Sequence, residues 1–231
     1  CGFKVPKYAH TPQVMKIDEE DGTKRKLSKR KDPEAAVSYF VEQGFPKGSL
    51  IEYLLTLLNS NFEDWRRANP KEDAFSFPFN LKKMSPSGCL FDLVKLNDVS
   101  KNVISVMRAD EVYNLVSEWA KKYDEDFYKV FTKDKAFSTE MVNIDRESPK
   151  PRKDIAKWEE VKEYFSYMFN EYYVSNFELP ENIKMEDAKA ILTEYIKVYD
   201  TNDDKDIWFN KIKELCESLG FTPNVKEYKQ N

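Results

Sequence analysis

Apolar residues at helical spacing fill the second half of this 231-residue chain. A stripe that recurs about every 3.6 residues predicts an amphipathic helix whose apolar face is buried. The four stripes are Val112, Leu115, Val116 and Trp119; Trp158, Val161, Phe165, Met168 and Phe169; Ile191, Leu192, Tyr195, Ile196 and Tyr199; and Ile207, Trp208, Ile212, Leu215, Cys216 and Leu219. The chain also has only six glycines, which disfavours a fold crowded with tight turns between strands. We therefore expect a mainly α-helical protein.

Helix signals also occur in the first half, after a start that reads as loop and short strand up to residue 20. Asp32 and Pro33 have the form of an N-cap followed by a first helical residue. Gly44 stands where a left-handed residue would end that helix. Ser49–Glu52 has the form of a capping box, and it predicts that a second helix begins near Pro46 or Ser49.

A dense basic cluster lies ahead of these helices. Six of the eight residues from Lys24 to Lys31 are cationic, although the net charge of the chain is −4. Contacts with phosphate depend on cations within about a Debye length. For phosphate binding, the local cluster therefore matters more than the net negative charge of the chain. A basic loop of this kind suits a polyphosphate better than a packing role.

The cysteine and histidine content and the lengths of the apolar runs bear on metal binding and on the expected cell compartment. Three scattered cysteines and one histidine offer neither a disulfide framework nor a zinc site, so we expect no bound metal. No apolar run approaches the ~20 residues that a membrane span needs. These features are typical of a protein of the reducing cytoplasm.

The segment Lys26–Arg30 (K-L-S-K-R) resembles the KMSKS-type signature of class I aminoacyl-tRNA synthetases, in the form typical of glutamyl-tRNA synthetases. Residues 8–12 (Y-A-H-T-P) resemble the lead-in to that loop. Residues 42–46 and 52–54 are similar to the helix pair that follows it, although Ile51-Glu52 replaces the usual apolar-Asn. Phe91–Asn97 matches the family's F-D-x-x-K-L pattern.

The resemblance implies an ATP-dependent ligase that activates glutamate and transfers it to tRNA. ATP with Mg²⁺ is the implied cofactor, and tRNA-Glu, with tRNA-Gln as a further option, is the implied partner. The implied fold is mainly α, with a KMSKS-loop remnant, a helical stem-contact domain and an all-helical anticodon-binding domain of the bacterial type. The expected boundaries are 1–32 for the end of the catalytic domain, 33–109 for the stem-contact domain and 110–231 for the anticodon-binding domain.

The family's HIGH motif is absent from these residues. We therefore expect the C-terminal part of a synthetase, incomplete at its own C-terminus and inactive by itself.

The resemblance also implies roles for individual residues. Lys29 matches the second lysine of the signature, which meets the ATP phosphates as pyrophosphate leaves, and a cation there would stabilise the developing negative charge. Lys26 and Ser28 would support the phosphates and the loop. Met15 would lie near the adenine, with core packing as its alternative. No role is implied for Lys24 or Arg25.

A second group of cations surrounds the Pro149–Pro151 break. Pro151-Arg152 with Asp154 resembles a stretch from which family members read the anticodon, and an arginine fork can meet a base edge or stack on it. The candidate RNA contacts are Arg146, Lys150, Arg152, Lys153 and Lys157. A charged linker between two helical groups is the alternative. Arg66, Arg67, Lys82 and Lys83 are weaker candidates for the inner tRNA stem.

Two other functions remain open at this point. The chain could be a stand-alone helical module that binds RNA or protein without catalysis. It could also come from a glutaminyl-tRNA synthetase, which a β-barrel after residue 110 would indicate.

Overall fold

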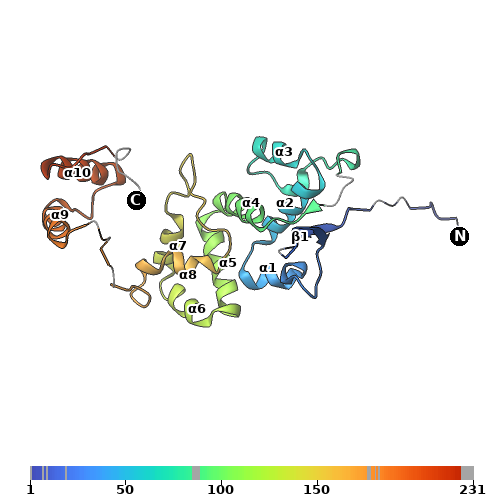
Figure 1. The fold of residues 1–231 in the computed structure, drawn as a ribbon, viewed down its shortest axis with the longest axis horizontal. Coiled ribbons are helices and arrows are strands. Elements are labelled where there is room, and N and C mark those ends of the chain that lie inside the picture. Colours follow the sequence, from blue (N-terminus) through green and yellow to red (C-terminus); the bar gives the residue numbers. More distant parts are fainter. Residues whose placement is uncertain are drawn as a thin grey trace. The chain divides into compact units, whose positions relative to one another are not determined.

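The computed structural model describes residues 2–6, 8, 10–18, 20–84, 89–175, 178–179, 181 and 183–224. The chain divides into two compact units, Cys1–Tyr173 and Val174–Asn231. The first unit contains a small sheet and most of the helices, and the second contains a pair of helices (Figure 1). None of the helices in the described part is both long and apolar enough to cross a membrane.

The sheet is small, and it places the basic cluster at one edge. Its strands are β1 (Val14–Ile17), β2 (Lys24–Lys26) and β3 (Cys89–Leu90), in the order β2-β1-β3. β1 pairs antiparallel with β2, with Met15 opposite Lys26, and parallel with β3, with Val14 opposite Cys89. The basic cluster is thus part strand and part turn, rather than a loop throughout.

A first group of helices follows the sheet. They are η1 (Pro33–Ala35), α1 (Val37–Gln43), α2 (Lys47–Leu58), α3 (Phe62–Ala68), η2 (Ala74–Ser76), η3 (Leu81–Lys83) and α4 (Leu93–Ser105). Their core is formed by Phe40, Phe45, Tyr53 and Leu96, which α1, α2, α4 and the intervening turn contribute. The aromatic rings of Phe40 and Phe45 meet edge to face. Such pairs add to the apolar area that the cluster buries.

The predicted capping box at Ser49 is wrong. α2 begins two residues earlier, at Lys47, with Pro46 in the N-cap position. Ser49 is fully buried, and its Oγ lies 2.8 Å from Oγ of Ser100 on α4. A buried polar atom needs a hydrogen-bond partner, and Ser100 provides one for Ser49. The hydroxyl of Ser49 therefore connects α2 to α4 and does not cap α2.

A second group of helices completes the first unit. They are α5 (Ala109–Tyr123), α6 (Glu125–Phe131), α7 (Lys135–Asn143), α8 (Glu160–Tyr164) and η4 (Ser166–Met168). Val112, Val116 and Val161 are completely buried among the aromatic rings of Phe127 and Phe131. The first two apolar stripes are therefore core, as their spacing predicts.

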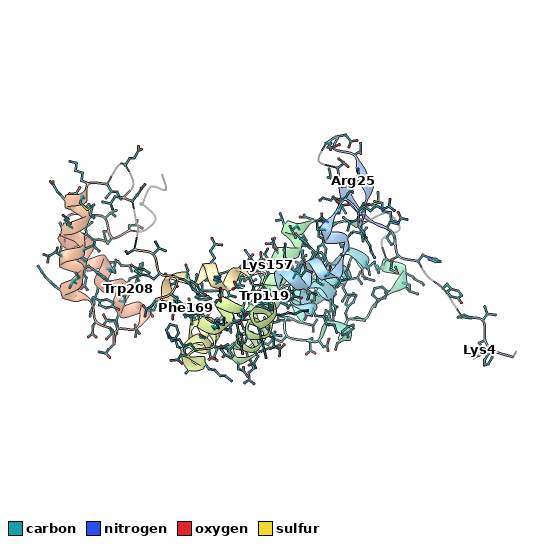
Figure 2. All side chains as sticks on the ribbon, turned by 90° about the horizontal axis from the view of Figure 1, so that it is seen from below. Lys4, Arg25, Trp119, Lys157, Phe169 and Trp208 are labelled. Atoms are coloured by element: carbon teal, nitrogen blue, oxygen red, sulfur yellow. The ribbon has the colours of Figure 1, made fainter. Side chains whose placement is uncertain are left out.

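The turn after α1 joins the two groups of helices. Gly44 ends α1 in the left-handed conformation, with φ of 83°, as its sequence position predicts. Its carbonyl accepts from the amide of Trp158 at 3.0 Å, and Trp119 Nε1 donates to the carbonyl of Glu42 at 2.9 Å. Both tryptophans are therefore structural, and Trp119 lies close to this turn in Figure 2.

The second unit consists of α9 (Met185–Val198) and α10 (Lys205–Ser218). Among its described residues Leu215 alone is buried, at 8% exposure. Leu192 and Ile196 on α9 are 52% and 74% exposed. The prediction that the last two stripes form a core is thus wrong for most of their residues within this unit.

Candidate functional site

Backbone hydrogen bonds hold the basic cluster in a closed turn. The amide of Leu27 donates to the carbonyl of Val14 at 3.0 Å, which extends the strand pairing by one residue. The amides of Lys31 and Asp32 both donate to the carbonyl of Ser28, at 3.0 and 2.8 Å. Residues 27–31 therefore form a turn that is fixed at both ends.

Arg25 points inward from this cluster. Its two terminal nitrogens donate to the two carboxylate oxygens of Asp32 at 2.7 and 2.8 Å, and its Nε donates to Asp18 at 2.5 Å. The hydrogen bond from Arg25 holds the pKa of Asp32 well below its ordinary value, and the amide of Ser28 lowers it further. Figure 2 labels Arg25 at the hairpin that β1 and β2 form.

The other cations of the cluster face solvent. The exposed side chains are those of Lys24, Lys26, Lys29, Arg30 and Lys31. Within the described part of the chain, none of them forms an ion pair. Their charge is available to an anion that approaches the turn, and neutralising it by binding would relieve mutual repulsion.

The predicted nucleotide residues come together at this corner of the sheet. Lys26 lies opposite Met15 in the β1–β2 ladder, and Met15 is half-buried in the central strand. Ser28 is half-buried and its Oγ accepts from the amide of Arg30 at 3.4 Å. Lys29 follows in the exposed part of the turn. Lys26 and Met15 are thus cross-strand neighbours, and Ser28 and Lys29 follow in the adjoining turn.

Arg146 is placed differently from the other predicted RNA contacts. Its guanidinium donates to the backbone carbonyls of Val142, Ile104 and Met107, at 2.9, 2.6 and 3.2 Å. Burial lowers the pKa of Arg146. Two of these carbonyls lie at or just beyond the end of α4, where carbonyl groups need partners. Arg146 therefore connects the C-terminal ends of α4 and α7 by hydrogen bonds.

The remaining four candidates lie between residues 150 and 157. Lys150 and Lys153 are exposed, and no described residue forms an ion pair with either. Arg152 is about half exposed, donates to Asp154 at 2.5 Å and reaches the hydroxyl of Tyr164. Its pKa is raised by the hydrogen bond to Asp154.

Lys157 is the most enclosed of these four. Its ammonium group donates to Gln43 at 3.1 Å and to Glu159 at 2.6 Å. It therefore also belongs to the junction at the end of α1, and Figure 2 labels it close to Trp119.

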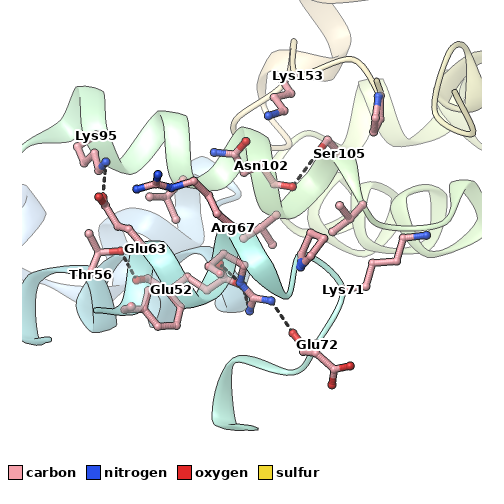
Figure 3. A pocket seen from close by; sticks show the side chains of 17 residues that line it. Glu52, Thr56, Glu63, Arg67, Lys71, Glu72, Lys95, Asn102, Ser105 and Lys153 are labelled. Carbon is pink, nitrogen blue, oxygen red and sulfur yellow. Dashed lines mark hydrogen bonds and ion pairs between the residues drawn. The ribbon is translucent and has the colours of Figure 1, made fainter. Parts of the chain in front are cut away.

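A groove of about 710 Å³ lies beside Lys153 (Figure 3). α2, α3, α4 and the 151–153 segment line it, and its basic side chains are Arg66, Arg67, Lys71, Lys95 and Lys153. Lys95 is paired with Glu63 and Arg67 with Asp64. The groove is therefore basic mainly through Lys71 and Lys153, for which no ion pair with a described residue is found.

Arg66 lines the groove, but its charge is paired. It forms a bidentate pair with Glu52, at 2.7 and 3.0 Å, and donates to the carbonyls of Asn69 and Glu72. Its guanidinium also lies over the ring of Trp65. The prediction left open whether Arg66 contacts the inner stem of tRNA, and this arrangement favours the structural alternative.

The sequence assigns no role to Arg25, whereas in the structure its guanidinium pairs with Asp32 and Asp18. The available signal was an aspartate just before Pro33, seven residues after Arg25. The sequence pattern predicts a helix cap for that aspartate. Asp32 does occupy the N-cap position of η1, but its side chain forms no cap hydrogen bond there.

Comparison with known proteins gives a consistent set of relatives. The chain is 51% identical to the glutamate–tRNA ligase of Clostridium perfringens strain 13 and 45% identical to that of Acetivibrio thermocellus. Each match covers the whole chain but 42% of the relative, so the chain spans less than half the length of these proteins. No family model matches the chain.

Solved structures agree on the fold. A crystal structure of a glutamate tRNA ligase from Elizabethkingia meningosepticum, in complex with its amino acid, superposes with a TM-score of 0.53 at 16% identity. Glutamate-tRNA synthetase from Elizabethkingia anophelis gives a TM-score of 0.55 at 15% identity. Each comparison covers 96% of this chain and 44% of the other.

Proposed function

We propose that this chain, which is related over its whole length to glutamate–tRNA ligases, is the tRNA-binding part of such an enzyme. The full-length enzyme would activate glutamate with ATP and transfer it to tRNA in the cytoplasm. The observation that carries the proposal is the turn of K-L-S-K-R sequence, which backbone hydrogen bonds fix and whose lysines face outward. It occurs in a chain that is similar to glutamate–tRNA ligases over its whole length. It favours the ligase over a stand-alone interaction module.

The turn would contribute to the ATP site of the full-length enzyme. Lys29 would contact the phosphates as pyrophosphate leaves, with Lys26 and Ser28 beside it. These groups lower the barrier by placing positive charge and a hydroxyl donor where negative charge develops. Met15 would offer apolar surface to the adenine. Mg²⁺ would accompany the ATP phosphates.

The helical parts would bind tRNA. We assign 1–32 to the end of the catalytic domain, 33–109 to a stem-contact domain and 110–231 to the anticodon-binding region. The exposed Lys150 and Lys153 are the strongest candidates for phosphate contacts, because neither forms an ion pair with a described residue. Arg152 could stack on a base, whereas Lys157 and Arg146 would act mainly by holding the surface in place.

The chain by itself should not form glutamyl-adenylate. The relatives it matches are more than twice as long, and the HIGH motif expected to hold ATP opposite the turn is not among these residues. The glutamate pocket and the grip on the acceptor end would also belong to the remainder of the enzyme.

Salt-dependent binding of tRNA-Glu to this chain tests the proposal. Each lysine that contacts a phosphate contributes about 1 to the slope of log K against log salt concentration. We expect Lys150→Gln and Lys153→Gln each to weaken binding and to reduce that slope by about 1. Lys121→Gln on α5 removes the same charge from an exposed position away from this segment and should leave the slope unchanged.

Two results would contradict the assignment. The RNA-binding proposal fails if the chain binds tRNA-Glu without salt dependence or not at all. The choice of residues fails if Lys121→Gln lowers the slope as much as the other two substitutions.

A further inference from the structure

Mutual repulsion among its cations should destabilise a compact conformation of the basic cluster. Six cations within eight residues repel one another, and repulsion favours an extended, mobile segment. The structure nevertheless holds residues 27–31 in a closed turn with three backbone hydrogen bonds at its ends. Some interaction must offset the repulsion and select this shape.

The carboxylate of Asp32 supplies that interaction. Its side chain is 2% exposed, and both of its oxygens are engaged by the guanidinium of Arg25. One oxygen also accepts from the amide of Ser28 at 2.8 Å. A single carboxylate thereby connects strand β2 to the second residue of the turn, and the planar fork of an arginine fits both oxygens at once.

Further charges support this pair from both sides. Asp18, at the end of β1, accepts from Nε of Arg25 at 2.5 Å. Lys16, on β1, pairs with Glu34 of η1 at 2.5 Å and lies 3.7 Å from Asp32. The carboxylates thus neutralise the two inward cations of the region and leave the outward ones free.

We propose that Arg25 and Asp32 are positioning residues of the nucleotide site, a clamp that presets the 27–31 turn so that Lys29 faces the phosphates. This inference rests on the proposed function and deepens it. Both residues would act through the turn and not by contact with the substrate. The clamp orders the turn before ATP binds. The entropy cost of ordering the turn is therefore not added to the activation barrier.

The test uses the full-length ligase and the rate of ATP–pyrophosphate exchange. Arg25→Gln and Asp32→Asn should each lower kcat by about 10- to 100-fold, because a misplaced catalytic group costs rate, with a smaller change in KM for ATP. Arg25→Lys keeps the charge but loses the fork, so we expect an intermediate rate. The double variant Arg25→Gln/Asp32→Asn should be little worse than either single variant, since both remove one interaction.

Lys24→Gln is the matched control. Lys24 precedes Arg25 on the same strand and carries the same charge, but it is exposed and forms no ion pair with a described residue. If Arg25 acted only through long-range charge, Lys24→Gln and Arg25→Gln would lower the rate equally. That result, or additive effects in the double variant, would overturn the clamp.

Lys29→Ala separates this inference from the proposed function. A normal exchange rate in Lys29→Ala would remove the turn from the chemistry, whatever the clamp does. A strong loss in Lys29→Ala together with normal rates in Arg25→Gln and Asp32→Asn would keep the proposed function and reject the clamp.

Hydrogen exchange covers the case in which a variant folds poorly. In the 231-residue chain the amides of Ser28, Lys31 and Asp32 should be protected, and Arg25→Gln should expose them while the α5 amides stay protected. Unchanged protection of the turn in Arg25→Gln would overturn the clamp without any activity measurement.

Discussion

Asp32 illustrates how a buried charge can make one turn of the chain sensitive to acid. Arg25 and Lys16 face its carboxylate, and the amide of Ser28 donates to it. Its pKa is lowered, first by the hydrogen bond from Arg25, from an ordinary value of 3.8. A depressed folded-state pKa contributes stability above the unfolded value, and that contribution disappears as the pH falls toward the folded value.

We expect the stability difference between the native chain and Asp32→Asn to be constant from pH 5 to pH 8 and to shrink below about pH 4. Urea unfolding at several pH values measures it. A stability difference that stayed the same at pH 3, or that grew there, would mean that Arg25 does not lower the pKa of Asp32 in the folded state.

The sequence does not show which arginines point inward to protein partners and which face solvent. The K-L-S-K-R motif indicated Lys26 and Lys29, and both face outward as a phosphate contact requires. Arg25, Arg66 and Arg146 are equally basic in the sequence, yet each donates to partners that lie 7 to 42 residues away. A basic pattern does not show whether such a partner folds back onto the arginine, so inward and outward arginines could not be separated.

At the scale of elements, the turn between α1 and α2 packs closely against Trp158. A Cβ on Gly44 would lie 2.7 Å from Cβ and 2.9 Å from the amide nitrogen of Trp158. The same residue has φ of 83°, which L-residues rarely adopt. Gly44→Ala therefore combines backbone strain with a collision against backbone that cannot move away cheaply.

We expect Gly44→Ala to lower the free energy of unfolding by about 3 kcal/mol, with contributions of roughly 1 to 2 from the backbone and 1 to 3 from the collision. Gly22→Ala is the control, because Gly22 has φ of 71° but nothing within 4 Å of the added Cβ. It should cost only the backbone contribution. Equal losses for the two variants, measured by urea denaturation, would show that the packing against Trp158 is not tight.

Periodicity predicted the existence of helices better than their ends or burial. α5 follows its apolar stripe, and Gly44 ends α1 as expected, because a positive φ suits glycine. α2 begins at Lys47, next to the Pro46 alternative, and only the capping box is wrong, because Ser49 makes a buried contact with Ser100 instead. The stripes of α9 and α10 are real, but a stripe shows which face is apolar and not whether a neighbour covers it.

At the scale of the whole chain, the two units differ in how much apolar surface they bury. The first unit has two aromatic-rich cores, whereas Leu215 is the one buried residue among those described in the second. Helices gain most of their stability from tertiary packing, and a pair of 14-residue helices with little packing is marginal in water.

We therefore expect the amides of α9 and α10 to exchange with deuterium roughly tenfold or more faster than those of α5 and α7 in this chain, because local opening is easiest where few apolar contacts must break. Mass spectrometry of peptides from each helix measures the rates. The matched reference is the same experiment with Gly44→Ala, which should speed exchange in the first unit and leave α9 and α10 unchanged. Equal protection of all four helices would show that the second unit draws stability from surfaces beyond its own two helices.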